Sequence, residues 1–381
     1  MHVLIAALHR PIHPTGVCRH AVNLALCLAE QHETTKVSLV VGSWQQHYFE
    51  TAFSLTSEKI KLISVKIKNT SFARNQWFLW GLPQLTKGIQ ADIVHLSFPF
   101  PFIRAKFDAP VVTTIHDLYP YEFPENFGFP QVWFNRLFLK QCINQSDGLA
   151  CVSQVTADKL KLYFPHLSPK QKIEVIYNYV DFEALQPQAP KQLSEPSLFL
   201  LSVAQHRQNK NLDLLIKSYD WLLNNHKINL NTQLVIVGTS GPETENIKGL
   251  IHSLSLESKV ILLSAIADCE LIWLYQNCQV FVIPSSTEGF CLPLAEALYF
   301  SDKLGNMTSL RIICSDIPIF REVGTSNCIY FSLENDAVTN LSQAIIEATS
   351  KHKFSNSSNI NRFNKSNVAK QYLDLYFQCS C

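Results

Sequence analysis

Two glutamates that can bind sugar hydroxyls flank an expected strand-to-helix turn. Glu288 and Glu296 lie eight positions apart in the segment QVFVIPSSTEGFCLPLAEAL, which begins at Gln279. Carboxylates accept hydrogen bonds from neighbouring hydroxyl groups, so one can hold a sugar and the other a ribose. Pro293 falls in the expected first helical turn, where the N–H groups have no intrahelical acceptor. These N–H groups and the helix dipole favour a bound phosphate.

Two cations follow another expected strand. Arg207 and Lys210 lie in LSVAQHRQNKNLDLLI, where an apolar run precedes an amphipathic helical pattern. Two positive charges at a strand end, beside a helix N-terminus, suit a diphosphate leaving group. The alternative is an ordinary pair of solvated surface charges.

Two further segments place polar groups or glycine after a strand. VVTTIHDL delivers His116 and Asp117 to a strand end, and PTGVCRH places Gly16 between the first strand and the first helix. The His-Asp pair can serve a binding site, or it can be a satisfied pair in the core. Gly16 allows a close approach of the backbone to a ligand, although glycine also serves ordinary turns.

Short apolar runs alternate with helical patterns along the chain, which predicts two doubly wound α/β domains. Ligands of such sheets bind at the carboxyl ends of the strands, where the residues above lie. We predict a first domain at residues 1–182, a linker at 183–197, a second domain at 198–360 and a C-terminal helix at 361–381, with a return to the first domain as an alternative for that helix. The expected strands are 3–8, 37–41, 60–65, 93–96, 111–115, 148–152, 173–176, 198–203, 234–237, 260–263, 280–283 and 311–314.

Composition narrows the functional classes. The 381 residues are 47% hydrophobic and 17% charged, with a net charge of +1, so the basic excess typical of nucleic-acid binding is lacking. The eleven cysteines form no C-x-x-C pair, which disfavours a zinc site and a disulfide scaffold. We expect no bound metal, since the sequence lacks an Asp-x-Asp triad, whose carboxylates could hold a divalent ion.

The N-terminus MHVLIAALHRP does not resemble a signal peptide, and no apolar run is long enough to span a bilayer. We therefore expect a cytoplasmic protein. The aromatic segments 72–80 and 97–102 are expected to be a buried helix and a hydrophobic loop. The alternative is peripheral contact with the inner face of the membrane.

The segment around the two glutamates resembles the E-x7-E motif of retaining glycosyltransferases of the GT-B fold, particularly glycosyltransferase family 4. This resemblance implies two Rossmann-like domains facing across a cleft that holds the active site. It implies that Glu296 binds the donor ribose, and that Glu288 lies by the donor sugar. Backbone amides at Phe290, Cys291 and Leu292 would contact the sugar and phosphates. The family usually has glycine at position 291, so cysteine there is a departure.

The other segments are similar to the same family. Lys210 begins a K-N-L-x-x-L-I pattern, which implies that Arg207 and Lys210 neutralise the donor pyrophosphate. A histidine at the end of the expected strand 111–115 implies that His116 lies near the donor sugar. The position of Gly16 corresponds to a glycine-rich loop that approaches donor phosphate or acceptor. Tyr179 replaces another usual glycine.

The resemblance implies a hexosyl transfer from a nucleoside diphosphate sugar to an acceptor hydroxyl, with retention at the anomeric carbon. No cofactor is implied beyond the donor substrate, a UDP-sugar or GDP-sugar, and the acceptor is a glycan or lipid-linked glycan. The alternatives are a catalytically silent partner or binding subunit, and a nucleotide-sugar epimerase or hydrolase. A dinucleotide oxidoreductase is disfavoured because no G-x-G-x-x-G follows the first strand of either domain.

Overall fold

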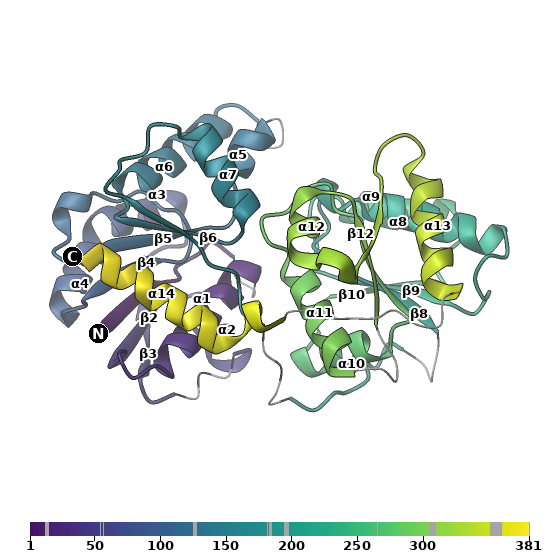
Figure 1. Cartoon of the computed structure of the whole chain (residues 1–381), viewed down its shortest axis with the longest axis horizontal. Coiled ribbons are helices and arrows are strands. Elements are labelled where there is room, and N and C mark those ends of the chain that lie inside the picture. The colour runs from purple at the N-terminus through teal and green to yellow at the C-terminus, as the bar shows by residue number, and fades with distance from the viewer. Residues whose placement is uncertain are drawn as a thin grey trace. The chain divides into compact units, whose positions relative to one another are not determined.

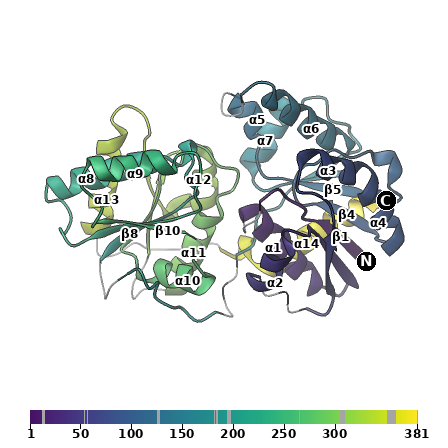
Figure 2. The same ribbon diagram turned by 180° about the vertical axis from the view of Figure 1, so that it is seen from behind.

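The chain divides into two α/β units, each built on its own parallel sheet (Figures 1 and 2). Unit 1 comprises Met1–Tyr179 and Asn361–Cys381, and unit 2 comprises Val180–Ile360. The computed structural model describes residues 1–11, 15–53, 55, 57–124, 128–180, 182, 185–193, 198–264, 266–304, 310–350 and 360–380. Parts of the predicted linker, residues 183–184 and 194–197, lie outside the described residues.

Unit 1 holds a seven-stranded sheet of order β3-β2-β1-β4-β5-β6-β7. Its strands are β1 (His2–Ala6), β2 (Lys36–Gly42), β3 (Ile60–Val65), β4 (Ile93–Leu96), β5 (Val111–Ile115), β6 (Gly148–Cys151) and β7 (Lys172–Val175). Its helices are α1 (Gly16–Ala29), α2 (Gln46–Thr51), α3 (Ser71–Gln76), α4 (Leu82–Ile89), α5 (Tyr119–Glu122), α6 (Gln131–Gln145), α7 (Gln154–Tyr163) and α14 (Lys365–Ser380), with shorter turns η1 (Trp77–Gly81), η2 (Arg104–Lys106) and η7 (Ile360–Phe363).

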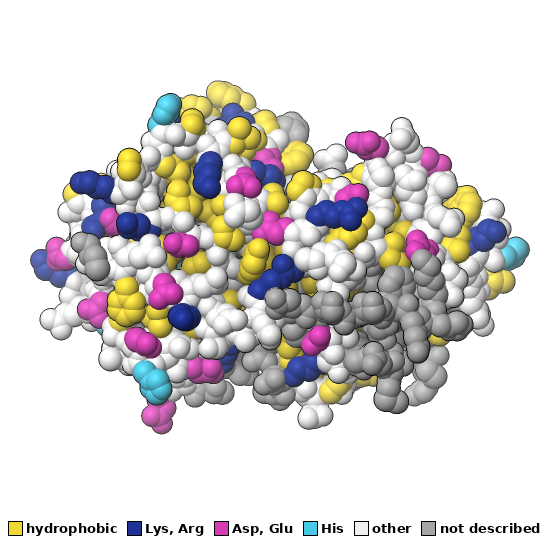
Figure 3. Space-filling model, in the orientation of Figure 1, with side chains coloured by type: hydrophobic (Ala, Val, Ile, Leu, Met, Phe, Trp, Pro, Cys, Tyr) yellow, Lys and Arg dark blue, Asp and Glu magenta, His cyan; other side chains and the backbone are white. Residues whose placement is uncertain are grey.

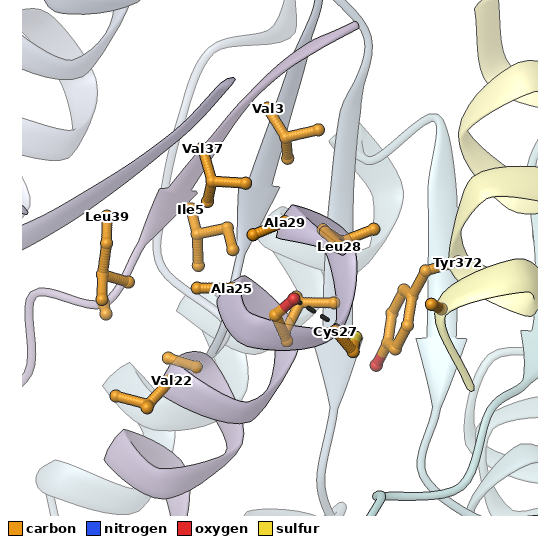
Figure 4. Packing of buried hydrophobic residues seen from close by; sticks show 14 of the residues in the cluster. Val3, Ile5, Val22, Ala25, Cys27, Leu28, Ala29, Val37, Leu39 and Tyr372 are labelled. Atoms are coloured by element: carbon orange, nitrogen blue, oxygen red, sulfur yellow. Dashed lines mark hydrogen bonds between the residues drawn. The ribbon is translucent and has the colours of Figure 1, made fainter. Parts of the chain in front are cut away.

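The central strands β1, β4, β5 and β6 are buried along their whole length, because both faces of this part of the sheet are covered. Side chains of β1 alternate between the two faces, so Val3 and Ile5 belong to one core and Leu4 and Ala6 to the other. The first core is filled by α1 and α14, and Figure 4 shows Tyr372 of α14 beside the α1 residues. The C-terminal helix is therefore part of the unit 1 core.

Unit 2 holds a six-stranded parallel sheet of order β10-β9-β8-β11-β12-β13. Its strands are β8 (Phe199–Val203), β9 (Gln233–Val237), β10 (Val260–Leu263), β11 (Val280–Ile283), β12 (Arg311–Ser315) and β13 (Ile329–Phe331). Its helices are α8 (Leu212–Asn224), α9 (Thr244–Ser253), α10 (Asp268–Asn277), α11 (Leu292–Leu304), α12 (Pro318–Gly324) and α13 (Ala337–Ser350), with turns η4 (Gln208–Lys210) and η6 (Thr325–Asn327).

The strand orders confirm two doubly wound sheets, and all of the predicted strands are present within a residue or two. The missed strand is β13, an edge strand of three residues that is too short to show a period. In each sheet the winding direction reverses at one place, between β1 and β4 in unit 1 and between β8 and β11 in unit 2. Such reversal points are where open α/β sheets bind ligands.

Candidate active site

The reversal point of unit 2 brings together two of the predicted site residues. Lys210 follows β8 and Glu288 follows β11, and these strands are neighbours although the residues lie 78 positions apart. The Lys210 Nζ atom lies 2.5 Å from Glu288 Oε1, and the side chains are only 17% and 12% exposed. Ser285 Oγ donates to the same carboxylate oxygen at 2.9 Å. The carboxylate is therefore held by two donors.

The two loops that carry this ion pair are joined by backbone and amide contacts. Asn209 Nδ2 donates to the carbonyl of Thr287 at 3.2 Å, and Asn211 Nδ2 donates to that of Pro284 at 2.8 Å. The N–H of Ser286 donates to the carbonyl of Asn209 at 2.9 Å. Nothing in the sequence singles out either asparagine, because each one binds a backbone carbonyl, and every residue has such a group.

Lys210 stays charged in this setting. Burial opposes the ammonium form, but the Glu288 carboxylate outweighs it and raises the pKa of Lys210 above its usual range. Arg207 is exposed, and within the described residues no ion pair to it is present. Since Glu288 balances Lys210, the exposed Arg207 on the same loop leaves a positive charge available to an anionic group.

The loop before α11 turns at Cys291, whose φ of +68° lies in the left-handed region. This region favours glycine, because a side chain on an L-residue is crowded there. The cysteine therefore occupies a glycine-type backbone position. The side chains of Phe290 and Cys291 are buried, and Leu292 is half-buried at the first position of α11. Burial keeps the pKa of the Cys291 thiol well above its usual range, so it is protonated.

Substitution at position 291 should reveal this conformation. We expect Cys291→Val to destabilise unit 2 by about 2 kcal/mol, because a β-branched residue is strained at positive φ. Cys291→Gly should cost less than about 1 kcal/mol, because glycine adopts this φ without strain. Urea denaturation of the two variants measures the difference, and equal losses would contradict the role of the backbone.

Glu296 lies inside unit 2, in the second turn of α11, and is 5% exposed. Tyr275 Oη in α10 donates to Glu296 Oε2 at 2.9 Å. Burial and then the neighbouring carboxylate hold the pKa of Tyr275 well above its usual range, so the phenol remains a donor. Sequence reasoning missed Tyr275, because it occupies an ordinary apolar position of a helical pattern.

Tyr275→Phe should destabilise unit 2 by about 1–3 kcal/mol, because it removes a hydrogen bond to a buried carboxylate without changing the packed ring. The free energy of unfolding in urea measures this loss. Tyr330→Phe serves as a comparison in the same unit, since that hydroxyl donates to backbone carbonyls instead. A Tyr275→Phe variant as stable as the wild type would mean that Glu296 is protonated or hydrated.

Two glycines after β9 were also missed. A side chain at Gly238 would meet the Ala204 carbonyl oxygen at 1.8 Å, and one at Gly241 would meet the His206 carbonyl oxygen at 2.3 Å. These glycines let the loop after β8 pack against the loop after β9. The sequence GTSG at residues 238–241 could have indicated this contact, because paired glycines after a strand are typical of a close backbone approach.

His116 belongs to unit 1 and lies at the end of β5. Its Nε2 atom lies 2.8 Å from the carbonyl oxygen of Ser97, and a carbonyl can only accept. The proton is therefore on Nε2, and Nδ1 is left as the acceptor. Burial lowers the pKa of His116, so the ring is neutral near pH 7. Ser97, and not Asp117, orients the imidazole, since the Asp117 carboxylate accepts from the N–H of Tyr119.

Behind His116 runs a buried chain of hydrogen bonds in which each proton can be placed. His20 Nδ1 lies 2.6 Å from Asn178 Oδ1 and must donate to it. His20 Nε2 then accepts from the Thr114 hydroxyl at 3.2 Å, and that hydroxyl accepts from His95 Nε2 at 2.8 Å. His95 Nδ1 accepts in turn from Tyr376 Oη of α14 at 2.9 Å. Burial lowers the pKa of His20 and of His95, so both imidazoles are neutral, and neutral rings fix these donors and acceptors.

The other predicted positions in unit 1 are less informative. Gly16 is exposed and begins α1, whose preceding residue Thr15 makes no side-chain cap. Tyr179 is buried in the core beside α1 and has no positive φ, so an ordinary residue fits where the family has glycine. The structure therefore pairs Lys210 with Glu288 in unit 2, and it places His116 and Gly16 in unit 1.

The aromatic segments 72–80 and 97–102 are only partly buried. Phe72 and Trp80 are 78% and 56% exposed, whereas Phe78 and Phe102 are fully buried. Figure 3 shows hydrophobic and basic side chains on the visible face of unit 1. Among the described helices, none combines the length and apolar character needed to cross a membrane.

Solved structures with this fold include known glycosyltransferases. WaaG, a glycosyltransferase involved in lipopolysaccharide biosynthesis, aligns over 100% of this chain and 98% of its own with a TM-score of 0.67 and 16% identity. Sucrose-phosphate synthase from Thermosynechococcus elongatus aligns over 98% and 94% with a TM-score of 0.68 and 15% identity. The two sheets and these matches define a GT-B fold.

The family models then assign the chain. Residues 14–184 match the model "Glycosyltransferase Family 4", and residues 186–362 match "Glycosyl transferases group 1". The chain therefore belongs to the group 1 glycosyltransferases of family 4, as the motifs predict. It is 28% identical over 340 residues to the O-antigen chain mannosyltransferase RfbU of Salmonella typhimurium, covering 86% of this chain and 88% of the relative. It is 25% identical to the serotype-specific mannosyltransferase WbdA of Escherichia coli, covering 61% of this chain and 29% of the relative.

Proposed function

We propose that this glycosyltransferase moves a hexose, with mannose the first candidate, from a nucleoside diphosphate sugar to a hydroxyl of a lipid-linked glycan. The observation that supports the donor class most directly is the Lys210–Glu288 pair beside Arg207 at the reversal point of the unit 2 sheet. The mannosyltransferase relatives favour mannose. A relative from Campylobacter jejuni is 31% identical over 39% of this chain and 36% of its own length. Its name includes a diphospho-undecaprenol substrate, which favours a lipid-linked acceptor.

The reaction breaks the bond between the anomeric carbon and the diphosphate oxygen and forms a bond to the acceptor oxygen. The acceptor proton passes to the departing phosphate, so no dedicated protein base is needed. Arg207, Lys210 and the first N–H groups of α11 stabilise the negative charge that develops on the diphosphate. Glu288 accepts hydrogen bonds from hydroxyls of the donor sugar, and Glu296 holds the ribose.

A lipid-linked acceptor places the enzyme at the inner face of the membrane. The exposed rings of Phe72 and Trp80 in unit 1 suit the headgroup region of a bilayer, where aromatic side chains are enriched. We therefore propose a cytoplasmic enzyme with peripheral membrane contact through exposed side chains of unit 1.

A thermal-shift screen against UDP, GDP, ADP and their common sugars tests this function. A ligand that binds only the folded state raises Tm by mass action. We expect one nucleotide to stabilise the wild type, and this gain to be lost in Lys210→Ala and Glu296→Ala. Lys217→Ala is the matched control, since that lysine is exposed and pairs with Asp213 on α8.

If no nucleotide shifts Tm, the silent-partner alternative is supported instead. If a nucleotide sugar is consumed at full rate without acceptor, an epimerase or hydrolase is supported. Transfer should also continue in EDTA, because Arg207 and Lys210 take the place of a divalent ion at the diphosphate.

A further inference from the structure

The ring of Phe98 lies at the surface of unit 1 beside His116. Phe98 follows β4 and is 38% exposed. Its ring lies nearly parallel to that of His116, at 22° with centroids 6.3 Å apart. The His9 ring meets it edge-on at 6.0 Å, and the Phe100 ring lies at 5.7 Å. Three neighbouring rings therefore fix the orientation of an aromatic side chain that is still open to solvent.

The position of Phe98 in the fold favours a ligand contact. It follows β4, which together with β1 marks the reversal point of the unit 1 sheet. The corresponding strand of unit 2 is β11, and the loop after it carries Glu288. Each reversal point thus presents a loop with a side chain capable of binding sugar, a carboxylate in unit 2 and an aromatic ring in unit 1. Ligands of open α/β sheets bind at these points.

The polar groups next to Phe98 complement it. His116 Nδ1 can accept a hydrogen bond, since Nε2 donates to Ser97. Asp117 is exposed, and its Oδ1 atom accepts from the N–H of Tyr119, so the carboxylate has further capacity to accept hydrogen bonds. A pyranose has one apolar C–H face and a rim of hydroxyl donors. An aromatic ring with neighbouring hydrogen-bond acceptors suits a pyranose, because the aromatic ring covers the C–H face and the acceptors bind the hydroxyls.

We propose that Phe98 is the stacking surface of an acceptor-sugar subsite in unit 1, with His116 Nδ1 and Asp117 accepting from the sugar hydroxyls. The inference rests on the proposed glycosyl transfer and extends it to the acceptor. The pyranose belongs to the acceptor and not to the donor, because the donor diphosphate is matched by Arg207 and Lys210 of unit 2.

Saturation-transfer-difference NMR on the full chain tests this subsite. The probes are the methyl glycosides of mannose, glucose, galactose, N-acetylglucosamine and N-acetylgalactosamine, each added to protein saturated with the nucleotide that the thermal-shift screen identifies. In the wild type we expect transfer to at least one glycoside, strongest at the protons of one ring face. Phe98→Ala should weaken that binding roughly fivefold, which corresponds to the loss of one aromatic contact.

Three further variants separate stacking from folding. Phe98→Tyr keeps the ring and should retain the signal, whereas Phe98→Leu keeps apolar volume without a ring and should lose most of it. Phe98→Leu also provides the test if the alanine variant does not fold. Trp133→Ala is the surface control, because it removes another exposed ring of unit 1 and should leave the signal unchanged.

Two outcomes would overturn the proposal. One is the lack of transfer to all five glycosides, and the other is transfer of equal strength in the wild type and in Phe98→Leu. Either result, obtained with protein that a nucleotide still stabilises, refutes the acceptor subsite and leaves the donor site of unit 2 standing. A protein that binds no nucleotide fails the earlier test of glycosyl transfer instead.

Discussion

Replacing Lys210 with methionine should lower kcat/KM by about 10²–10³-fold, the usual effect of removing one group that stabilises charge in a transition state. The reason is that Lys210 remains protonated beside Glu288 and lies on the loop after β8, where a departing diphosphate needs a cation. The measurement is the release of nucleoside diphosphate from the donor that the thermal-shift screen identifies. Lys217→Met, which removes an exposed charge from the adjoining helix, should leave the rate unchanged.

A stability control is needed, because Lys210→Met also leaves the Glu288 carboxylate nearly buried without its cation. Breaking such a pair costs about 3 kcal/mol, whereas neutralising both members costs much less. The double variant Lys210→Met with Glu288→Gln should therefore recover most of the lost stability but none of the lost activity. Recovery of activity together with stability would show that Lys210 acts only by supporting the fold.

Unit 1 should lose about 4 kcal/mol of stability between pH 7.5 and 5.5. Burial lowers the pKa of His9 and of His95 to about 3, and it lowers the pKa of His20 well below its usual 6.5. Above pH 6.5 these groups are neutral in both folded and unfolded states, so stability there is independent of their titration. Below pH 6.5 these histidines bind protons in the unfolded chain but remain neutral in the folded unit. Each histidine then costs about 1.4 kcal/mol per pH unit, which for His9 and His95 continues down to about pH 3.

The surroundings of these imidazoles explain why their protonation is unfavourable in the folded unit. His20 and His95 share the Thr114 hydroxyl, and an extra proton on either ring would face a donor or require that hydroxyl to find a new acceptor. Asn178 and Tyr376 occupy the outer ends of the same chain. His9 Nε2 faces the Ser97 hydroxyl, and nearby Arg74 adds positive charge that further disfavours a second cation.

Hydrogen exchange followed by mass spectrometry measures this effect in each unit separately. The free energy of opening for β4 and β5 should fall steeply from pH 7.5 to 5.5, after correction for intrinsic exchange. Strands β8 and β9 form an internal control, because His206 is the sole buried histidine among the described residues of unit 2. Equal losses in the two units would contradict the explanation, and His95→Gln should reduce the loss in unit 1 by about 1.4 kcal/mol per pH unit.

Much of the fold could be predicted because the relevant signals are local. Alternating apolar runs predict both sheets, and Pro293 with the Ser-Ser-Thr loop predicts the start of α11, which is observed at Leu292. The strand β13 was missed since three residues cannot display a period. The departure at Cys291 was visible in the sequence, but only the backbone shows that the cysteine adopts the φ of the glycine that it replaces.

The sequence by itself determined which residues follow strands, and therefore which side chains reach the carboxyl ends of the two sheets. It could not determine which of these side chains meet, because that depends on the order of strands in each sheet. Lys210 reaches Glu288 since β8 and β11 are neighbours despite two intervening strands. Tyr376 reaches His95 across 281 residues since α14 packs into unit 1. Local periodicity encodes the elements, whereas burial of their apolar faces against one another decides these contacts.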